Sequence, residues 1–259
     1  MGETQPVRDR VLAELERIES ENGVRVLLAV ESGSRAWGFA SPDSDYDVRF
    51  IYAHDRNWYI SVVEPRDVIE EMLPDDLDVS GWDLRKTLRL FSKCNLALNE
   101  WLGSPIVYSE VTEFRQQLAG LMPRFFNPIA GIHHYRSMAT RTFTENYAEG
   151  RIGIKKLFYV LRPLLACRWI ERRLSQPPTE FAALLASELV TPDERGWISD
   201  LLVRKADARE AAVINLDPSR AASVETELER YKSAAQMLSA SSTGNVDDLD
   251  TLLRSWAVK

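Results

Sequence analysis

The sequence is poor in cysteine and histidine, the usual ligands of zinc. Two of its 259 residues are cysteines, Cys94 and Cys167, and three are histidines. Neither cysteine has a histidine nearby in the sequence, so we predict neither a disulfide framework nor a zinc site and expect both thiols to be buried. His133 and His134 would point about 100° apart on a helix, so we do not expect them to share one site.

Long apolar runs and several well-known catalytic motifs are also missing. No apolar run approaches the roughly 20 residues of a membrane span, and the polar opening MGETQPVRDR lacks the core of a signal peptide. We therefore expect a cytoplasmic protein without a membrane partner. The sequence contains no Ser-His-Asp order, Walker-type glycine-lysine string, Rossmann fingerprint or HExxH motif, so hydrolase, P-loop and dehydrogenase functions lack support.

Basic charge is scarce overall but locally concentrated. The formal net charge is −7, which argues against a surface that attracts nucleic acid everywhere. Residues 151–173, however, contain seven Lys or Arg residues against Glu171 alone, a local charge of plus six. If the protein handles a polyanion, we expect it to do so through this segment.

The chain changes in texture near residue 108. Before that point, the pattern predicts a helix over 7–22 and a helix from residue 84, with strands over the ranges 24–32, 45–53, 67–73 and 77–83. After it, helical patterns follow one another, separated by prolines and glycines. The sequence thus predicts an α+β fold with a first domain over 1–108 and an all-helical domain over 109–259.

The stretch GSRAWGFASPDSDYDVRF, residues 33–50, combines a Gly-Ser turn with spaced aspartates. A turn at Gly33 and Ser34 that leads into a short helix allows close backbone approach to a phosphate. On the next strand Asp45 and Asp47 share one face. Two neighbouring carboxylates both stay ionised when a cation lies between them, and Mg²⁺ suits oxygen ligands. Alternatively, these aspartates are ordinary turn and strand-end residues.

These residues also carry a resemblance. Gly33-Ser34, ten further residues and Asp45-Tyr46-Asp47 resemble the signature of the DNA polymerase beta nucleotidyltransferase superfamily. The longer strings GSRAWGFASPDSDYDVRFIY and LDVSGWDLRKTLRLFSKCNLALNEWLGSPIVY closely resemble the RlaP family of predicted nucleotidyltransferases. The resemblance covers about residues 25–108 and continues more weakly through GIKKLFYVLRPLLACRWIE. Tyr46 departs from the simplest superfamily pattern, in which a small aliphatic residue is common.

The resemblance implies a nucleotidyltransferase fold, a mixed sheet with flanking helices. It also implies attack of an acceptor hydroxyl on the α-phosphate of a metal-bound nucleoside triphosphate. Three carboxylates would hold Mg²⁺ (or Mn²⁺) and accept the hydroxyl proton: Asp45, Asp47 and a third from a neighbouring strand. Asp78 is our choice for the third, with Asp83 as its rival. Asp83 directly precedes a helix and is well explained as its N-cap.

The same resemblance indicates nucleotide-binding residues. Gly33 and Ser34 would seat the triphosphate, and Arg35 either reaches a phosphate or pairs with a surface acid. In related two-domain nucleotidyltransferases a helical domain lends cationic residues to the triphosphate. By resemblance this role falls to the basic segment, at Lys156, Tyr159 and Arg162; the alternative is a helix whose polar face is solvated or paired with acids.

The sequence therefore predicts a Mg²⁺-dependent nucleotidyltransferase that acts on a nucleoside triphosphate. Its acceptor, an RNA 3′ end, a protein or a small molecule, stays open, as do the preferred nucleotide and the oligomeric state. The alternative is a catalytically silent nucleotide-binding regulator. The short amphipathic segment 245–259 serves either domain packing or partner binding.

Overall fold

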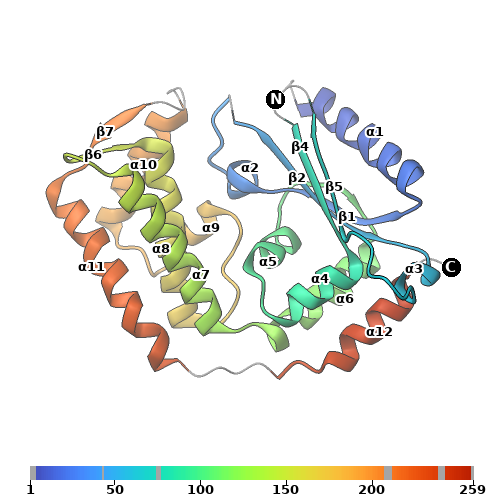
Figure 1. Ribbon diagram of the computed structural model, residues 1–259. Coiled ribbons are helices and arrows are strands. Elements are labelled where there is room, and N and C mark those ends of the chain that lie inside the picture. Colours follow the sequence, from blue (N-terminus) through green and yellow to red (C-terminus); the bar gives the residue numbers. More distant parts are fainter. Residues whose placement is uncertain (1–3, 43, 74–76, 207–211, 239–242, 258–259) are drawn as a thin grey trace. The chain divides into compact units, whose positions relative to one another are not determined.

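The computed structural model describes residues 4–42, 44–73, 77–206, 212–238 and 243–257, and these form two compact units (Figure 1). The sheet unit falls within 1–36, 45–125 and 243–259, and the helical unit within 37–44 and 126–242. The α+β class predicted from the sequence is confirmed, with the sheet in the first part of the chain and helices dominating the second.

The sheet unit is built on five strands in the order β3-β4-β2-β1-β5. Strands β2 and β4 run parallel, and the other neighbours are antiparallel. Its elements in chain order are α1 (Thr4–Asn22), β1 (Arg25–Glu31), α2 (Gly33–Trp37), β2 (Tyr46–Ala53), α3 (Arg56–Tyr59), β3 (Val68–Leu73), β4 (Leu77–Asp83), α4 (Leu84–Ser92), α5 (Leu96–Leu102), β5 (Val107–Glu110), α6 (Thr112–Phe125) and α12 (Val246–Trp256).

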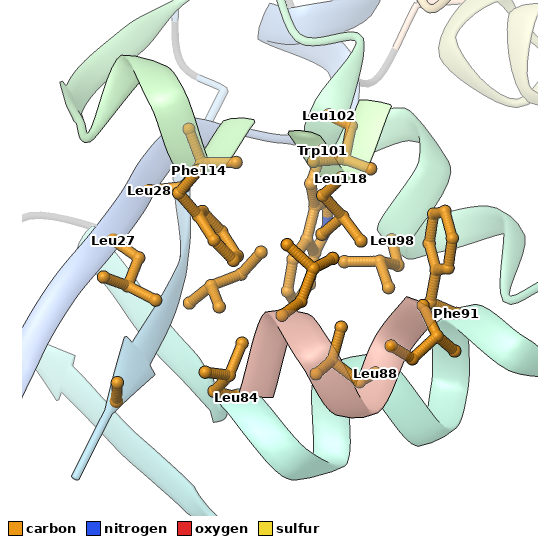
Figure 2. Packing of buried hydrophobic residues seen from close by; sticks show 14 of the residues in the cluster. Leu27, Leu28, Leu84, Leu88, Phe91, Leu98, Trp101, Leu102, Phe114 and Leu118 are labelled. Carbon is orange, nitrogen blue, oxygen red and sulfur yellow. The ribbon is translucent and has the colours of Figure 1, made fainter. Parts of the chain in front are cut away.

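Apolar side chains cover both faces of this sheet. On one face, residues of α1 pack with Val48, Phe50 and Tyr52 of β2. On the other, residues of α4, α5, α6 and α12 pack with Ile51 and Ala53. Figure 2 shows Leu84 and Leu88 of α4 and Trp101 of α5 in this cluster. Because side chains alternate along a strand, Asp47 and Arg49 share the second face with Ile51 and Ala53. The sequence thus places polar groups at the start of β2 and apolar groups at its end.

The C-terminal helix α12 belongs to the sheet unit. Leu249 and Leu252 are buried in the cluster that contains α4, so the described part of segment 245–259 packs against its own chain. The helix α6 lies in the same unit. Both helices follow residue 108, so the compact units are not the sequence ranges 1–108 and 109–259. The division into a catalytic domain over 1–108 and a helical domain over 109–259 stays a prediction.

The helical unit centres on α7 and α8. Its elements are α7 (Pro128–Asn146), β6 (Arg151–Gly153), α8 (Ile154–Arg173), α9 (Phe181–Ala186), α10 (Pro192–Ala206), β7 (Val213–Asn215), α11 (Pro218–Ala234) and the 3₁₀ turn η1 (Ala235–Met237). The short antiparallel pair β6–β7 was not predicted from the sequence. Within the described ranges, no helix has the length and apolar character needed to cross a membrane.

Asparagine and aspartate side chains begin several helices. Asn95, Asn127, Asp217 and Asn245 each accept a hydrogen bond from a backbone N–H in the first turn of the helix that follows. Such caps satisfy backbone donors that a helix cannot pair internally. The two cysteines contribute to packing instead: Cys94 and Cys167 are buried, as the sequence predicted.

Candidate active site

The turn after β1 is fastened directly to the start of β2. The backbone N–H of Ser32 donates to the carbonyl oxygen of Asp47 over 2.8 Å. The next residue, Gly33, has φ +60°, and a Cβ built on it would lie 2.4 Å from Asp47 Oδ2. Only glycine therefore suits this position, because it adopts a left-handed backbone and leaves room for the carboxylate. The Gly-Ser turn and Asp47 form one local structure.

Asp47 and Asp78 lie side by side on parallel strands. They are register partners in the β2–β4 pair, and neighbouring strands are about 4.8 Å apart. A single nitrogen joins the carboxylates: Nη2 of Arg49 donates to Asp47 Oδ1 over 3.1 Å and to Asp78 Oδ2 over 2.7 Å. The structure therefore brings together two of the three predicted carboxylates, with a guanidinium between them.

Arg49 is held by the backbone as well. Its Nη1 donates to the carbonyl oxygens of Val48, over 3.0 Å, and Asp78, over 3.2 Å. The side chain is 19% exposed, against 33% for Asp47 and 30% for Asp78. Arg49 was not singled out in the sequence analysis. Its position two residues after Asp47, on the same strand face, was the available signal.

The rival third carboxylate, Asp83, lies at the far end of β4 and is fully buried. It caps α4, since its Oδ1 accepts from the N–H groups of Arg85, over 2.7 Å, and Lys86, over 3.4 Å. Its Oδ2 accepts from the Tyr59 hydroxyl over 2.7 Å. Burial raises the pKa of this carboxyl, and its hydrogen bonds oppose the shift. Asp83 thus has the structural role that its position before a helix indicated.

Asp45 and Arg35 form the edge of the site. Asp45 directly precedes β2, and its side chain is exposed. Its carbonyl oxygen accepts from Arg35 Nε over 3.0 Å, and the Arg35 guanidinium lies 3.7 Å from the centroid of the Tyr46 ring. Arg35 therefore holds the backbone at Asp45 and stacks on Tyr46. A contact between Arg35 and a phosphate stays a prediction.

A buried glutamate accepts a hydrogen bond from the backbone of Asp47. Glu31, at the end of β1, is fully buried. Its Oε1 accepts from the backbone N–H of Asp47 over 2.8 Å, and its Oε2 accepts from the Tyr108 hydroxyl. Burial raises the pKa of Glu31, while both hydrogen bonds favour its ionised form. The sequence analysis included Glu31 only within the strand predicted over 24–32; an acid at the end of a buried strand was the available signal.

The three residues predicted on the basic segment have different surroundings in the helical unit. Arg162 is fully buried, where its Nε and Nη2 donate to the carbonyl of Thr179 over 3.2 and 3.0 Å and its guanidinium lies 4.4 Å from the Trp37 ring centroid. Tyr159 meets Trp37 edge-on at 5.1 Å. Lys156 is exposed. Their contacts with a triphosphate stay a prediction.

Part of the charge of the basic segment is neutralised within the helical unit. Arg168 pairs with Glu227 at 2.5 Å and with Glu194 at 2.7 Å, and Arg173 pairs with Glu188. These acids lie outside residues 151–173, so counting charge within the segment overstated its attraction for polyanions. The segment is a weaker argument for an RNA partner than its sequence indicated.

Comparison with known proteins places the chain in a family. The model of the RNA repair pathway DNA polymerase beta family, RlaP, matches residues 7–255. The chain belongs to the RlaP family. It is also 46% identical over 248 residues to the uncharacterized protein YcgL of Bacillus subtilis (strain 168), an alignment that covers 95% of each chain. The family resemblance read from residues 25–108 is thereby confirmed and extended over nearly the whole chain.

Because the chain belongs to the RlaP family, the next question is whether Asp45, Asp47 and Asp78 could hold a divalent ion. Across the described ranges, no three His, Cys, Asp or Glu side chains gather closely enough to hold a metal ion. Asp45 therefore does not form a three-carboxylate cluster with Asp47 and Asp78. The latter pair nevertheless fits a cation, because both carboxylates contact the same cationic nitrogen and are oxygen ligands of the kind that Mg²⁺ prefers.

Proposed function

We propose that this chain is a metal-dependent nucleotidyltransferase that moves a nucleoside monophosphate from a nucleoside triphosphate to an acceptor hydroxyl. The pairing of Asp47 with Asp78 across β2 and β4, directly beside the Gly33 turn, carries the proposal. Membership of a family related to DNA polymerase beta supports the class of reaction. If these aspartates were ordinary turn and strand-end residues, the fold would need neither two carboxylates in register nor a glycine that leaves room for one of them.

Asp47 and Asp78 would hold Mg²⁺, or Mn²⁺. Asp45, the further ligand predicted from the sequence, does not cluster with them in the described ranges, and the proposal does not depend on it. A bound divalent ion supplies charge stabilisation to the attacking and leaving oxygens of a phosphoryl transfer. Asp78 would accept the proton of the acceptor hydroxyl. The hydroxyl oxygen forms a bond to the α-phosphorus, the bond from that phosphorus to the α,β-bridging oxygen breaks, and pyrophosphate leaves.

The triphosphate would lie at the turn after β1. Gly33 and Ser34 supply backbone there, and Arg35 already holds the next strand through the carbonyl of Asp45. These three residues are therefore proposed as nucleotide-binding. For Lys156, Tyr159 and Arg162, the predicted phosphate contacts rest on the resemblance alone, and the proposal does not depend on them.

The acceptor is proposed by chemistry rather than by name. The family description refers to an RNA repair pathway, which makes an RNA 3′ hydroxyl the first acceptor to test. A protein hydroxyl and a small molecule are the other two. The basic segment adds no support for RNA as the acceptor, because Arg168 pairs with Glu194 and Arg173 pairs with Glu188.

One observation favours a second candidate function. The guanidinium of Arg49 already bridges the two carboxylates, as in a protein that keeps the site without using a metal. The second candidate is therefore a nucleotide-binding regulator without turnover. It would bind a nucleoside triphosphate but release no pyrophosphate from it.

Pyrophosphate release decides between these functions. The protein is incubated with each of the four ribonucleoside triphosphates and Mg²⁺, with RNA bearing a free 3′ hydroxyl, a protein mixture or no acceptor. Transfer of an α-³²P label to the acceptor with release of pyrophosphate supports the transferase. Nucleotide binding without release from any triphosphate supports the regulator.

A matched pair of variants ties the activity to the site. Asp78→Asn removes one of the paired carboxylates and should reduce transfer at least 100-fold. Asp250→Asn removes a carboxylate from the exposed surface of α12, where Asp250 pairs only weakly with Arg254 at 3.4 Å, and should leave transfer unchanged. Equal activity of the Asp78→Asn variant and the wild type would refute the assignment of Asp78.

A further inference from the structure

The strongest unexplained feature of the site is the cation that the chain itself places there. Arg49 reaches along its own strand to Asp47 and across to Asp78 on β4, and its Nη2 contacts one oxygen of each carboxylate. Asp47 and Asp78 would hold a divalent ion through carboxylate oxygens, the ligand type that Arg49 contacts here. The sequence analysis assigned no role to this arginine.

We propose that Arg49 is the resident counter-ion of the nucleotide-free protein, and that a divalent ion must take its place between Asp47 and Asp78. This inference rests on the proposed metal site. It adds a positioning residue that holds the two carboxylates together in the absence of the ion and lowers the affinity of the free protein for that ion.

Electrostatics supports the first half of this role. Two carboxylates in register on neighbouring strands repel each other, and both side chains are about two-thirds buried. A guanidinium relieves the repulsion and donates a charge-assisted hydrogen bond to each of them. Without it, the metal-free protein would leave two like charges adjacent, so Arg49 should stabilise the fold when no ion is bound.

Competition supports the second half. A divalent ion that approaches both carboxylates is repelled by the positive charge of Arg49. In addition, Oδ1 of Asp47 and Oδ2 of Asp78 already accept hydrogen bonds from Nη2 of Arg49. The guanidinium does not leave without cost, because Nη1 is also held by the carbonyls of Val48 and Asp78. Removing Arg49 should therefore make the ion bind more tightly, which is the reverse of what loss of a ligand or of local structure would cause.

The test measures Mn²⁺ binding to the nucleotide-free protein by titration followed by electron paramagnetic resonance. Arg49→Met keeps an apolar stem and removes the charge and the hydrogen bonds. We expect its Mn²⁺ affinity to rise at least tenfold, about 1.4 kcal/mol, and its thermal midpoint in EDTA to fall below that of the wild type. Mn²⁺ should recover more of the midpoint in this variant than in the wild type.

Three further variants separate the possible causes. Arg254→Met removes a positive charge from the exposed face of α12 and controls for the general change in charge; its Mn²⁺ affinity should equal that of the wild type. Arg49→Lys keeps the charge and should bind Mn²⁺ less tightly than Arg49→Met. Arg49→Met/Asp47→Asn should lose the gained affinity, which locates the gain at this pair of carboxylates.

An unchanged or weaker Mn²⁺ affinity in folded Arg49→Met would overturn the role of Arg49 as a competing counter-ion. If Arg49→Met does not fold, Arg49→Gln, which also removes the charge, takes its place, and a Mn²⁺ affinity no higher than that of the wild type would overturn the proposal. Label transfer by the wild type is measured separately. If the wild type transfers label but Arg49→Met does not bind Mn²⁺ more tightly, the proposed function stands and the role of Arg49 fails. If Arg49→Met binds Mn²⁺ more tightly but the wild type transfers no label, the role of Arg49 stands and the proposed function fails.

Discussion

The backbone of Gly33 lies against the carboxylate of Asp47. A Cβ on Gly33 would approach Oδ2 to 2.4 Å, and the backbone there has φ +60°. The carbonyl of Asp47 in turn accepts from the N–H of Ser32. The glycine of the turn and the aspartate of the strand are therefore constrained together, although they lie in different elements of the chain. A change at one position must alter the other.

We expect Gly33→Ala to abolish nucleotidyl transfer and to destabilise the sheet unit by about 2–4 kcal/mol. The left-handed backbone accounts for about 1 kcal/mol of this, and the displacement of Asp47 accounts for the rest. Urea unfolding measures the free energy of unfolding, and label transfer measures the activity.

Gly23→Ala is the matched control. Gly23 has nearly the same backbone conformation, with φ +62°, but nothing lies within 4 Å of a Cβ built there. It should therefore show only the conformational cost of about 1 kcal/mol and keep full activity. Equal losses of stability in the two alanine variants would show that the contact with Asp47 contributes nothing.

The sequence could predict the parts of this site that depend on local pattern. The buried run before Gly33, the strand that contains Asp47 and the strand that contains Asp78 were each readable from apolar periodicity and turn residues. The preference for Asp78 over Asp83 followed from the resemblance, which implies a third acid within a strand, and from the helix that Asp83 precedes. In the structure Asp83 caps α4, whereas the catalytic role of Asp78 stays a proposal.

The remaining parts depend on register and on burial, which are not local. Arg49 bridges Asp47 and Asp78 only because β2 and β4 pair residue 47 with residue 78. Likewise, the plus-six segment was a count along the chain, whereas α10 and α11 supply acids to Arg168. Arg162 occupied a plausible polar helix position, but tertiary packing buries it against Trp37.

The buried guanidinium of Arg162 gives a second prediction. Its planar fork donates twice to the carbonyl of Thr179 and stacks on Trp37. A lysine keeps the charge but cannot donate twice in this way or stack a planar group on Trp37. We therefore expect Arg162→Lys to lower the free energy of unfolding by about 2–3 kcal/mol. Urea unfolding followed by circular dichroism provides the measurement.

Lys156→Met is the comparison for Arg162→Lys. Lys156 lies on the same helix, α8, but its side chain is exposed, so the change should stay within about 0.5 kcal/mol of the wild type. Should Arg162→Lys prove as stable as Lys156→Met, the contacts of Arg162 with Thr179 and Trp37 would carry no net stabilisation.

A third prediction concerns Gly81 and Phe50, register partners on β4 and β2. A Cβ on Gly81 would lie 2.3 Å from two atoms of the Phe50 ring, so the ring covers the glycine. Gly81→Ala should destabilise the protein by about 2–3 kcal/mol by forcing the ring aside. In a Phe50→Leu background the same change should have a smaller effect, and urea unfolding of the double-mutant cycle measures this coupling.

Gly120→Ala tests whether added volume alone explains a loss at Gly81. Gly120 lies in α6, and nothing lies within 4 Å of a Cβ built on it, so alanine should stabilise the helix by up to about 1 kcal/mol. Opposite signs for Gly81→Ala and Gly120→Ala are the expected pattern. Additive effects of Gly81→Ala and Phe50→Leu would contradict the proposed contact.

His54 gives a prediction for pH. Its ring stacks on Trp58 with a centroid distance of 4.1 Å and meets Tyr52 edge-on at 5.4 Å. Burial lowers the pKa of His54 from 6.5 to about 4, because the charged ring loses hydration there. Between these two pKa values the unfolded chain binds more protons than the folded one, so this group makes stability fall as the pH falls from about 6.5 to 4.

His54→Phe should remove this dependence while keeping an aromatic ring against Trp58. We expect the free energy of unfolding of the wild type, minus that of His54→Phe, to decrease by about 1 kcal/mol between pH 7 and pH 5; the figure is well below the full shift because the ring is partly exposed. Two charged neighbours are present in both proteins: Asp83, which accepts from Tyr59, and Arg85, which lies over the rings of Trp58 and Tyr59. The raised pKa of Asp83 has the opposite dependence, and it cancels in the difference. A difference that stays constant over this range would show that His54 titrates alike in the folded and unfolded chains.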